Sequence, residues 1–227
     1  MSHTSSTTPT PTTSSANPRA SALIIVDLAN DFVYAGGTIA DAGGSEYQTR
    51  AATVIPPLQR LLAAARQSGV TVIYSTDAHT PADSELRKWP PHSMAGTHNA
   101  QIVDGLTPQP GDIVLGKTTY SQFQTDGEID RVLAERGIRT VYIAGLHTDC
   151  CARHTSGDVF QRGYDLVWVT DALQAFTQAQ HEAGLEYYKA WYATDVDRQF
   201  HTADEIAEEW RAAATHAESP ELAEAAR

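Results

Sequence analysis

The sequence has 227 residues, of which 41% are hydrophobic, and a formal net charge of −12. A chain of this length forms one large domain with a full hydrophobic core, and its acidic surface repels phosphate backbones, so we expect no nucleic-acid partner. No apolar run approaches the roughly 18 residues of a membrane span, and the N-terminus has no secretory h-region, so we expect no membrane partner. The two cysteines are adjacent, which excludes a disulfide framework and favours a reducing, cytoplasmic location.

The two ends of the chain differ in composition from the part between them. Residues 1–20 contain five Ser, six Thr and three Pro, too little apolar surface to offset the entropy of ordering, so we predict a disordered tail. Residues 203–227 carry seven acidic and two basic side chains, which is typical of a solvated helical face. We therefore expect a single domain over residues 21–217 and an acidic tail over residues 218–227.

Five short apolar runs follow one another along the chain and are typical of strands buried on both faces. Helical patterns separate these runs, and strands that alternate with helices form βαβ units with a parallel sheet. The sequence therefore predicts an α/β fold in three layers (α/β/α), with a doubly wound, mostly parallel central sheet. The runs are residues 22–28, 70–75, 112–115, 140–146 and 164–170.

The spacing of apolar residues predicts three of the helices between these strands. In the first, apolar residues over 55–65 recur at helical intervals. At the start of the second, Thr125 and Glu128 have the spacing of a capping box. In the third, which Gly163 ends, three residues share one face: Thr155, Val159 and Phe160.

Two charged residues stand where apolar strands end, which is where ligands bind in parallel α/β sheets. Asp27 lies inside the first apolar run and Lys117 follows the third; a buried charge is costly unless it is paired. Asp27 is either a cap or structural ion pair, or a carboxylate that burial tunes to act as a base. Lys117 is either a snorkelling side chain or a functional ammonium. The sequence alone leaves both choices open.

The second apolar run leads into a candidate metal site made of Asp77, His79 and the more distant His92. One carboxylate and two imidazoles suit a divalent ion that keeps open positions for water or ligand. The Asp-x-His spacing also occurs by chance, and a histidine is often simply packed. Metal binding and plain packing therefore both stay open.

The fourth apolar run leads to Cys150 and Cys151 and then to a helix. A cysteine in the first helical turn has its thiolate stabilised by the positive helix end, and a nearby lysine would lower the thiol pKa further. The free N–H groups of that turn can hold an oxyanion. The alternatives are a small buried hydrophobe and a vicinal redox pair. An Asp, a Lys and a Cys at the ends of three strands nevertheless point to one crevice and one nucleophilic site.

Five motifs, jointly and in this order, resemble those of the isochorismatase-like cysteine hydrolases, most closely the nicotinamidase branch. The resemblance covers about residues 22–192, and the combination is far more specific than any one motif. The motifs are IVDLANDF (25–32), TDAH (76–79), WPPHSMAGT (89–97), GKTTYSQF (116–123) and GLHTDCCARHT (145–155).

The resemblance implies a role for each matching residue. The family's catalytic triad maps to Asp27, Lys117 and Cys151, because its cysteine stands six residues after the glycine that ends the fourth strand. The family's metal, which would be zinc or else iron or manganese, maps to Asp77, His79 and His92. The Leu146–His147 peptide bond would be cis, and the N–H groups of His147 and Cys151 would form an oxyanion hole. Two aromatic residues would flank a substrate ring: Phe32 and Trp89.

Several positions depart from the family pattern. Ala29 stands where the family usually has Gln, Ser93 where many nicotinamidases have Cys, and His147 where Ala is common. The stretch between His79 and His92 is short and charged. These departures leave the triad and the metal ligands intact, and they bear on the choice of substrate.

The resemblance implies amide hydrolysis through a thioester, with nicotinamide as the favoured substrate. Another small amide, lactam or carbamoyl compound is the alternative within the same chemistry. A vinyl-ether hydrolase of isochorismate type, which needs no thiol, and a non-catalytic metal-binding protein are the alternatives of other classes. We expect a small-molecule amide as the substrate and a homo-oligomeric assembly.

Overall fold

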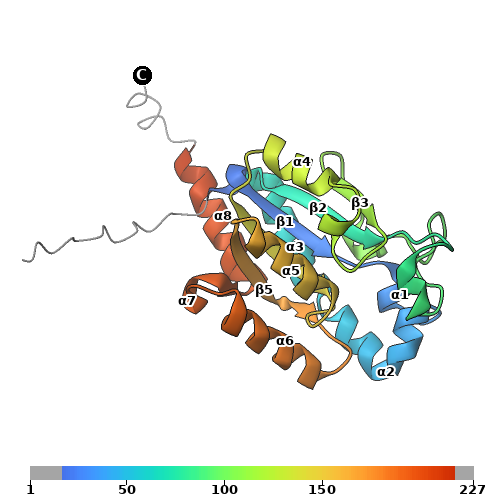
Figure 1. Cartoon of the computed structure of the whole chain (residues 1–227). Helices are drawn as coiled ribbons and strands as arrows, with labels where there is room; N and C mark the ends of the chain where they lie inside the picture. The colour runs from blue at the N-terminus through green and yellow to red at the C-terminus, as the bar shows by residue number, and fades with distance from the viewer. Residues whose placement is uncertain (1–16, 218–227) are drawn as a thin grey trace, which may run out of the picture.

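The computed structural model describes residues 17–217, so the predicted tails over residues 1–16 and 218–227 lie outside the described residues. Residues 17–20, the end of the predicted N-terminal tail, include a short 3-10 helix, Pro18–Ala20, with Pro18 buried. Six strands form one sheet in the order β3-β2-β1-β4-β5-β6 (Figure 1). All pairings are parallel, which confirms the predicted fold class. The strands are β1 Ser21–Val26, β2 Thr71–Asp77, β3 Ile113–Lys117, β4 Thr140–Leu146, β5 Asp165–Gln174 and β6 Phe200–His201.

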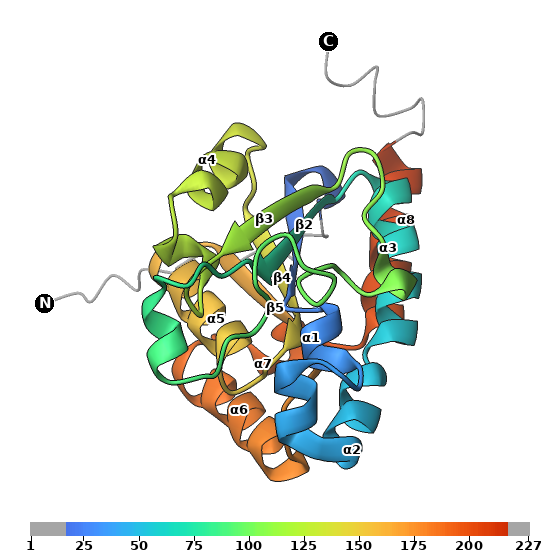
Figure 2. The ribbon, with the colours of Figure 1, turned by 90° about the vertical axis from the view of Figure 1, so that its right-hand side faces the viewer.

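Helices cover both faces of this sheet and make three layers (Figures 1 and 2). Helices α3 and α8 pack on one face, and α4, α5 and α6 pack on the other. The α-helices are α1 Asn30–Val33, α2 Thr38–Ala52, α3 Ile55–Ser68, α4 Glu128–Glu135, α5 Cys151–Gln161, α6 Gln178–Trp191, α7 Val196–Gln199 and α8 Ala203–Ala217. Single 3-10 turns lie at Ser84–Arg87, Asp104–Leu106 and Gln122–Gln124.

The central strand β1 explains why the strands are continuously apolar. Leu23 and Ile25 belong to the core under α3 and α8, whereas Ile24 and Val26 belong to the core under α4 and α5. Since side chains alternate between the faces of a strand and both faces are covered, every position of β1 is buried.

Two local predictions about the helices are wrong. The N-cap of α4 is Gly127 in a left-handed conformation, and the side chain that accepts the Glu128 N–H is Asp126, at 2.9 Å, and not Thr125. The Asp126 carboxylate accepts this amide from a position only two residues before it. Phe160 is 42% exposed because it lies five residues after Thr155, about 140° around the helix from the buried face.

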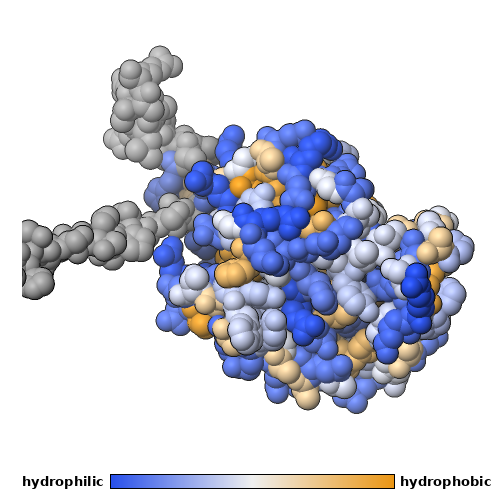
Figure 3. All heavy atoms as spheres, in the orientation of Figure 1, coloured by the Kyte–Doolittle hydropathy of each residue, from blue (hydrophilic) through white to orange (hydrophobic). Residues whose placement is uncertain are grey.

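The exterior is mostly hydrophilic. On the face drawn in Figure 3, hydrophobic residues appear as separate spots among hydrophilic ones. Among the described residues, no helix has both the length and the apolar character that crossing a membrane requires.

The connections of the sheet place its switch point between β1 and β4. The chain passes outward from β1 to β2 and β3, and then returns to add β4 on the opposite side of β1. Gly145, near the end of β4, has φ +109°, and a Cβ there would lie 2.0 Å from the Val26 carbonyl oxygen. Only glycine permits this close approach. The carboxyl ends of β1 and β4 therefore meet at the crevice where α/β sheets bind ligands.

Candidate active site

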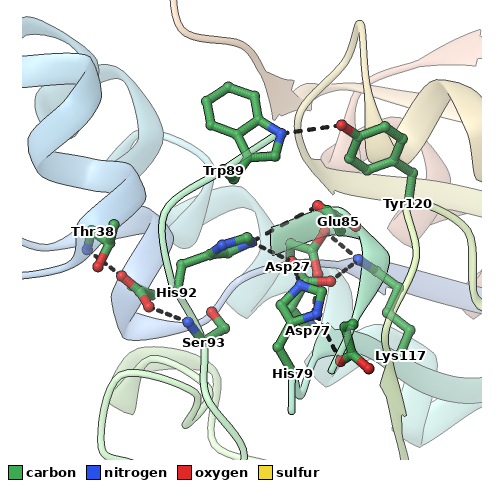
Figure 4. A network of polar contacts seen from close by, with 12 residues as sticks. Asp27, Thr38, Asp77, His79, Glu85, Trp89, His92, Ser93, Lys117 and Tyr120 are labelled. Atoms are coloured by element: carbon green, nitrogen blue, oxygen red, sulfur yellow. Dashed lines mark hydrogen bonds and ion pairs between the residues drawn. The ribbon is translucent and has the colours of Figure 1, made fainter. Parts of the chain in front are cut away.

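The charged residues at the ends of β1, β2 and β3 form one buried network. Lys117 Nζ lies 2.8 Å from Asp27 Oδ2 and also contacts Asp77 Oδ1 (Figure 4). Asp27 Oδ1 accepts the Asp77 N–H at 3.0 Å. All three side chains are completely buried, so Lys117 does not snorkel, and its ammonium is paired with two carboxylates.

The network gives its two carboxylates very different affinities for protons. Burial, and next the charge of Asp77, raise the pKa of Asp27 to about 7, although Lys117 acts to lower it. Burial also acts to raise the pKa of Asp77, but Lys117 and the imidazoles beside it hold that pKa well below its usual range. Asp27 can therefore gain or lose a proton near neutral pH, whereas Asp77 stays ionised.

Cys151 is the first residue of α5, is buried, and forms a hydrogen bond with the Asp27 carboxyl group. Its thiol pKa lies well above the usual value, because of a hydrogen bond with Cys150 and then because of burial, while Lys117 acts in the opposite direction. The prediction of a lowered thiol pKa is therefore wrong for this state. Lys117 is already engaged by two carboxylates, so the thiol is neutral and hydrogen-bonded to a carboxylate.

The turn before Cys151 has the shape that the family resemblance implies. The Leu146–His147 peptide bond is cis. The N–H groups of Cys150 and Ala152 both donate to the His147 carbonyl oxygen, at 3.0 and 3.2 Å. The Cys151 N–H between them belongs to the first turn of α5, whose amides have no acceptor within the helix.

A cavity of about 220 Å³ opens above Cys151. Across its upper side the Trp89 indole N–H donates to the Tyr120 hydroxyl at 3.1 Å (Figure 4). On its wall Phe176 stacks on the His147 imidazole, with the two ring centroids 4.3 Å apart. Phe32 and Trp89 both line the cavity, and their contact with a substrate ring stays a prediction. Its lining residues are Phe32, Ile39, Glu85, Trp89, His92, Tyr120, His147, Asp149, Cys150, Cys151, Phe176 and Gln180.

The predicted metal ligands converge beside this cavity, and a fourth residue joins them. The Nε2 atoms of His79 and His92 lie 3.5 and 3.4 Å from Asp77 Oδ2. Glu85 Oε1 lies 3.9 Å from His92 Nε2, and one ligand atom from each of the four residues lies within 4.8 Å of the others (Figure 4). Glu85 was not predicted as a ligand.

This cluster has the chemistry of a divalent-metal site. Asp77 Oδ2 and His79 Nε2 are buried without a hydrogen-bond partner among the described residues. The Nδ1–H of His79 donates to Asp83 at 3.2 Å, and that of His92 donates to the Pro90 carbonyl at 2.9 Å. Both imidazoles therefore turn Nε2 toward the centre while an acceptor holds the outer nitrogen, as in metal-binding histidines. Two nitrogen and two carboxylate ligands suit Zn²⁺, and iron or manganese are compatible.

Residues outside the predicted set hold these groups in place. The Asp31 carboxylate accepts the backbone N–H groups of Thr38 and Ser93, and so ties α2 to the loop that carries His92. Tyr47, from α2, contacts His147, and Phe176 follows β5. The motif that contains Asp31 was a usable signal, whereas Tyr47 and Phe176 lie outside all five motifs.

Comparisons with known proteins agree with this architecture. Residues 21–224 match the isochorismatase domain family. The chain is 34% identical over 191 residues to the ureidoacrylate amidohydrolase RutB of Pseudomonas syringae pv. syringae, a match that covers 75% of this chain and 74% of the relative.

Two solved structures extend the comparison. N-carbamoylsarcosine amidase from Thermoplasma acidophilum is 32% identical with a TM-score of 0.69, covering 81% of this chain and 96% of the other. Nicotinamidase PncA from Bacillus subtilis is 28% identical with a TM-score of 0.66, covering 74% and 94%. The chain therefore belongs to the isochorismatase family, within the isochorismatase-like hydrolases.

Proposed function

We propose that this chain is an amidohydrolase that cleaves a small, neutral carboxamide through a thioester on Cys151. The observation that carries the proposal is that Asp27 contacts both Lys117 and Cys151, and that Cys151 lines a cavity with aromatic walls. The amidohydrolase names of the relatives support the same reaction class.

The mechanism begins with a neutral thiol. Because Asp27 has a pKa of about 7 and is hydrogen-bonded to Cys151, it accepts the thiol proton as sulfur attacks the amide carbon. The Lys117 ammonium stabilises the negative charge that passes between the two groups. The N–H groups of His147 and Cys151 donate to the oxyanion, each contributing about 3–4 kcal/mol. Asp27 then protonates the leaving ammonia, and later takes a proton from the water that hydrolyses the thioester.

The neighbouring metal cluster has a separate role in this proposal. Asp77, His79, Glu85 and His92 would hold a divalent ion, with zinc favoured by the ligand set. When bound, this ion supplies a coordination point for an acceptor atom of the substrate, such as a ring nitrogen.

The cavity favours a small neutral substrate. Its volume of about 220 Å³ is below the roughly 300–1,000 Å³ of sites for drug-sized ligands. Among the described residues that line it, none is Arg or Lys, whereas Glu85 and Asp149 are acidic. A substrate carboxylate would meet no arginine or lysine there, and the ion that Glu85 and His92 would help to hold is the one cation it could reach. An aromatic carboxamide such as nicotinamide therefore fits the walls better than an anion.

A ureido compound is the second candidate. It is favoured by the similarity to a ureidoacrylate amidohydrolase and to an N-carbamoylsarcosine amidase. Both names describe substrates with a carboxylate as well as a carbamoyl group, and that carboxylate would lie near the acidic residues of the cavity. A neutral ureido compound avoids this conflict.

Ammonia release from a matched panel tests the proposal. Nicotinamide and pyrazinamide should be turned over faster than ureidoacrylate and N-carbamoylsarcosine, and isochorismate should not be cleaved. Stoichiometric alkylation in the Cys150→Ala background, which leaves Cys151 as the single thiol, should remove all turnover. Cleavage of isochorismate that survives alkylation would instead indicate the vinyl-ether hydrolase, and a protein without any turnover would be a non-catalytic binder.

A further inference from the structure

The imidazole of His147 lines the cavity but has no part in the mechanism above, which uses only the backbone N–H of this residue. The ring is 4% exposed. Its Nε2 lies 2.7 Å from the Tyr47 hydroxyl, and one face stacks on Phe176 with an interplanar angle of 19°. These contacts fix the orientation of the ring before any ligand binds.

Tyr47 also fixes which ring nitrogen carries the proton. The Tyr47 side chain is completely buried, and among the described residues its hydroxyl group has only His147 Nε2 as a hydrogen-bond partner. If Nε2 carried a proton, the Tyr47 O–H would be left buried without an acceptor, which is costly. The Tyr47 O–H therefore donates to Nε2. Burial lowers the pKa of His147 to about 3, so the ring is neutral and its single proton is on Nδ1.

The Nδ1–H group faces the cavity. It has no hydrogen-bond partner among the described residues, yet it is not one of the fully buried polar atoms that lack a partner. The accessible edge of the ring is therefore the Nδ1 edge, and the space it borders is the cavity above Cys151. A hydrogen-bond donor in a preset orientation thus lies beside the reacting centre.

We propose that His147 is a specificity-determining residue whose Nδ1–H donates a hydrogen bond to an acceptor of the substrate, a carbonyl oxygen or an aromatic ring nitrogen outside the scissile amide. Tyr47 is the positioning residue that holds this tautomer. The inference rests on the proposed function and narrows its substrate class to carboxamides with a second acceptor. A substrate without that acceptor leaves the donor unpaired, and sites of this kind reject such analogues.

Binding to the Cys151→Ala protein tests this inference without turnover. Pyrazinamide has ring nitrogens, and benzamide has nearly the same shape without them. With His147 in place, pyrazinamide should bind about tenfold more tightly than benzamide. This preference for pyrazinamide should be lost when His147 is changed to Leu. It should be largely kept in His147→Asn, whose amide N–H lies near the former Nδ1. Ring nitrogens also face any bound metal, but that contribution is common to all the proteins when their metal content is matched.

Three further measurements separate this role from a structural one. His181→Leu removes another buried imidazole that lies outside the cavity lining, and it should leave the pyrazinamide preference unchanged. Nitrogen chemical shifts of His147 should report a proton on Nδ1, and Tyr47→Phe should give a mixture of tautomers with an intermediate preference. Turnover of the carboxamide panel by the unmodified protein tests the proposed function separately.

The inference is overturned if His147→Leu keeps the pyrazinamide preference, if the proton resides on Nε2, or if pyrazinamide does not bind the Cys151→Ala protein. Failure of the proposed function looks different, because the preference and the tautomer would persist in a protein that hydrolyses no amide.

Discussion

Two regions meet at the candidate active site, and they are built in different ways. Asp27 and Lys117 stand at the ends of strands, and the β2–β3 register pairs Lys117 directly with Asp77. His79 is followed by a loop that carries Glu85, within a single 3-10 turn, and then His92. The sheet therefore sets the positions of two groups of the proposed triad, whereas a loop carries three of the four residues of the candidate metal cluster and part of the cavity wall. In such an arrangement the rigid sheet keeps the geometry of the proposed reaction constant, and changes in the loop alter which ligand binds.

The strand-end region should show the largest effect on activity. Cys151→Ala removes the atom that attacks, so amide turnover should fall at least about a thousandfold, measured as ammonia release. The fold should survive, because Ala also fits a helix start. Cys150→Ala is the matched control, and it should keep most of the turnover. A dead Cys150→Ala protein beside an active Cys151→Ala protein would mean that the nucleophile is misassigned by one residue.

Lys117 tests whether the two regions depend on one another. Lys117→Met leaves the carboxylates of Asp27 and Asp77 buried without their cation. Breaking a buried pair from one side typically costs about 3–5 kcal/mol of unfolding free energy, and kcat should fall by orders of magnitude. Denaturant unfolding and ammonia release measure the two effects.

The control for Lys117 is Lys189→Met, which removes a surface lysine paired with Glu186. The free energy of unfolding of this variant should equal that of the unchanged protein. Normal kcat in a destabilised Lys117→Met protein would show that the lysine is purely structural.

The loop region should decide metal content. Purified protein should hold about one divalent ion per chain, and His79→Ala and His92→Ala should each lose it, because each removes a nitrogen ligand from a four-residue cluster. Elemental analysis measures this directly. The exposed His216 provides the control, since His216→Ala should retain the ion. Full metal content in both ligand variants would contradict the site.

The difference between the strand ends and the loop also explains which features could be predicted from the sequence. Asp27 and Lys117 were identifiable because a charge at the end of an apolar strand is conspicuous, and parallel strands bring their ends to one edge. Strands β1, β2, β4 and β5 were also predictable, since both faces of the sheet are covered there. Strand β3 was predicted as well, but it lies at an edge and is only partly buried, so the expectation of burial on both faces is wrong for it. Helix α2 was not, because Gly43 lies within it and Gly44 interrupts its helical backbone, which removes the usual periodic signal. The homo-oligomeric assembly and the cytoplasmic location stay predictions.

The sequence pattern could not predict contacts between residues that loops bring together from distant parts of the chain. Glu85 joins the metal cluster only because the loop folds back over β2, and a charged loop residue is normally solvated. The direction of the Cys151 pKa shift also depended on geometry. Lys117 could not be assigned to the thiol or to the carboxylates until its distances to Asp27 and Asp77 were known.

The smallest effect we predict concerns Asp83, which touches the metal cluster only through His79. Its carboxylate accepts the His79 Nδ1–H at 3.2 Å and the Thr80 N–H at 2.7 Å. Asp83→Ala should weaken metal affinity by about 10–100-fold without abolishing binding, because the imidazole loses the partner that fixes its orientation and tautomer. Competition with a chelator measures the affinity. Asp126→Ala removes a comparable carboxylate that accepts a backbone N–H far from the cluster. The metal affinity of the Asp126→Ala protein should stay unchanged. Equal affinities in the two variants would mean that the loop alone orients His79.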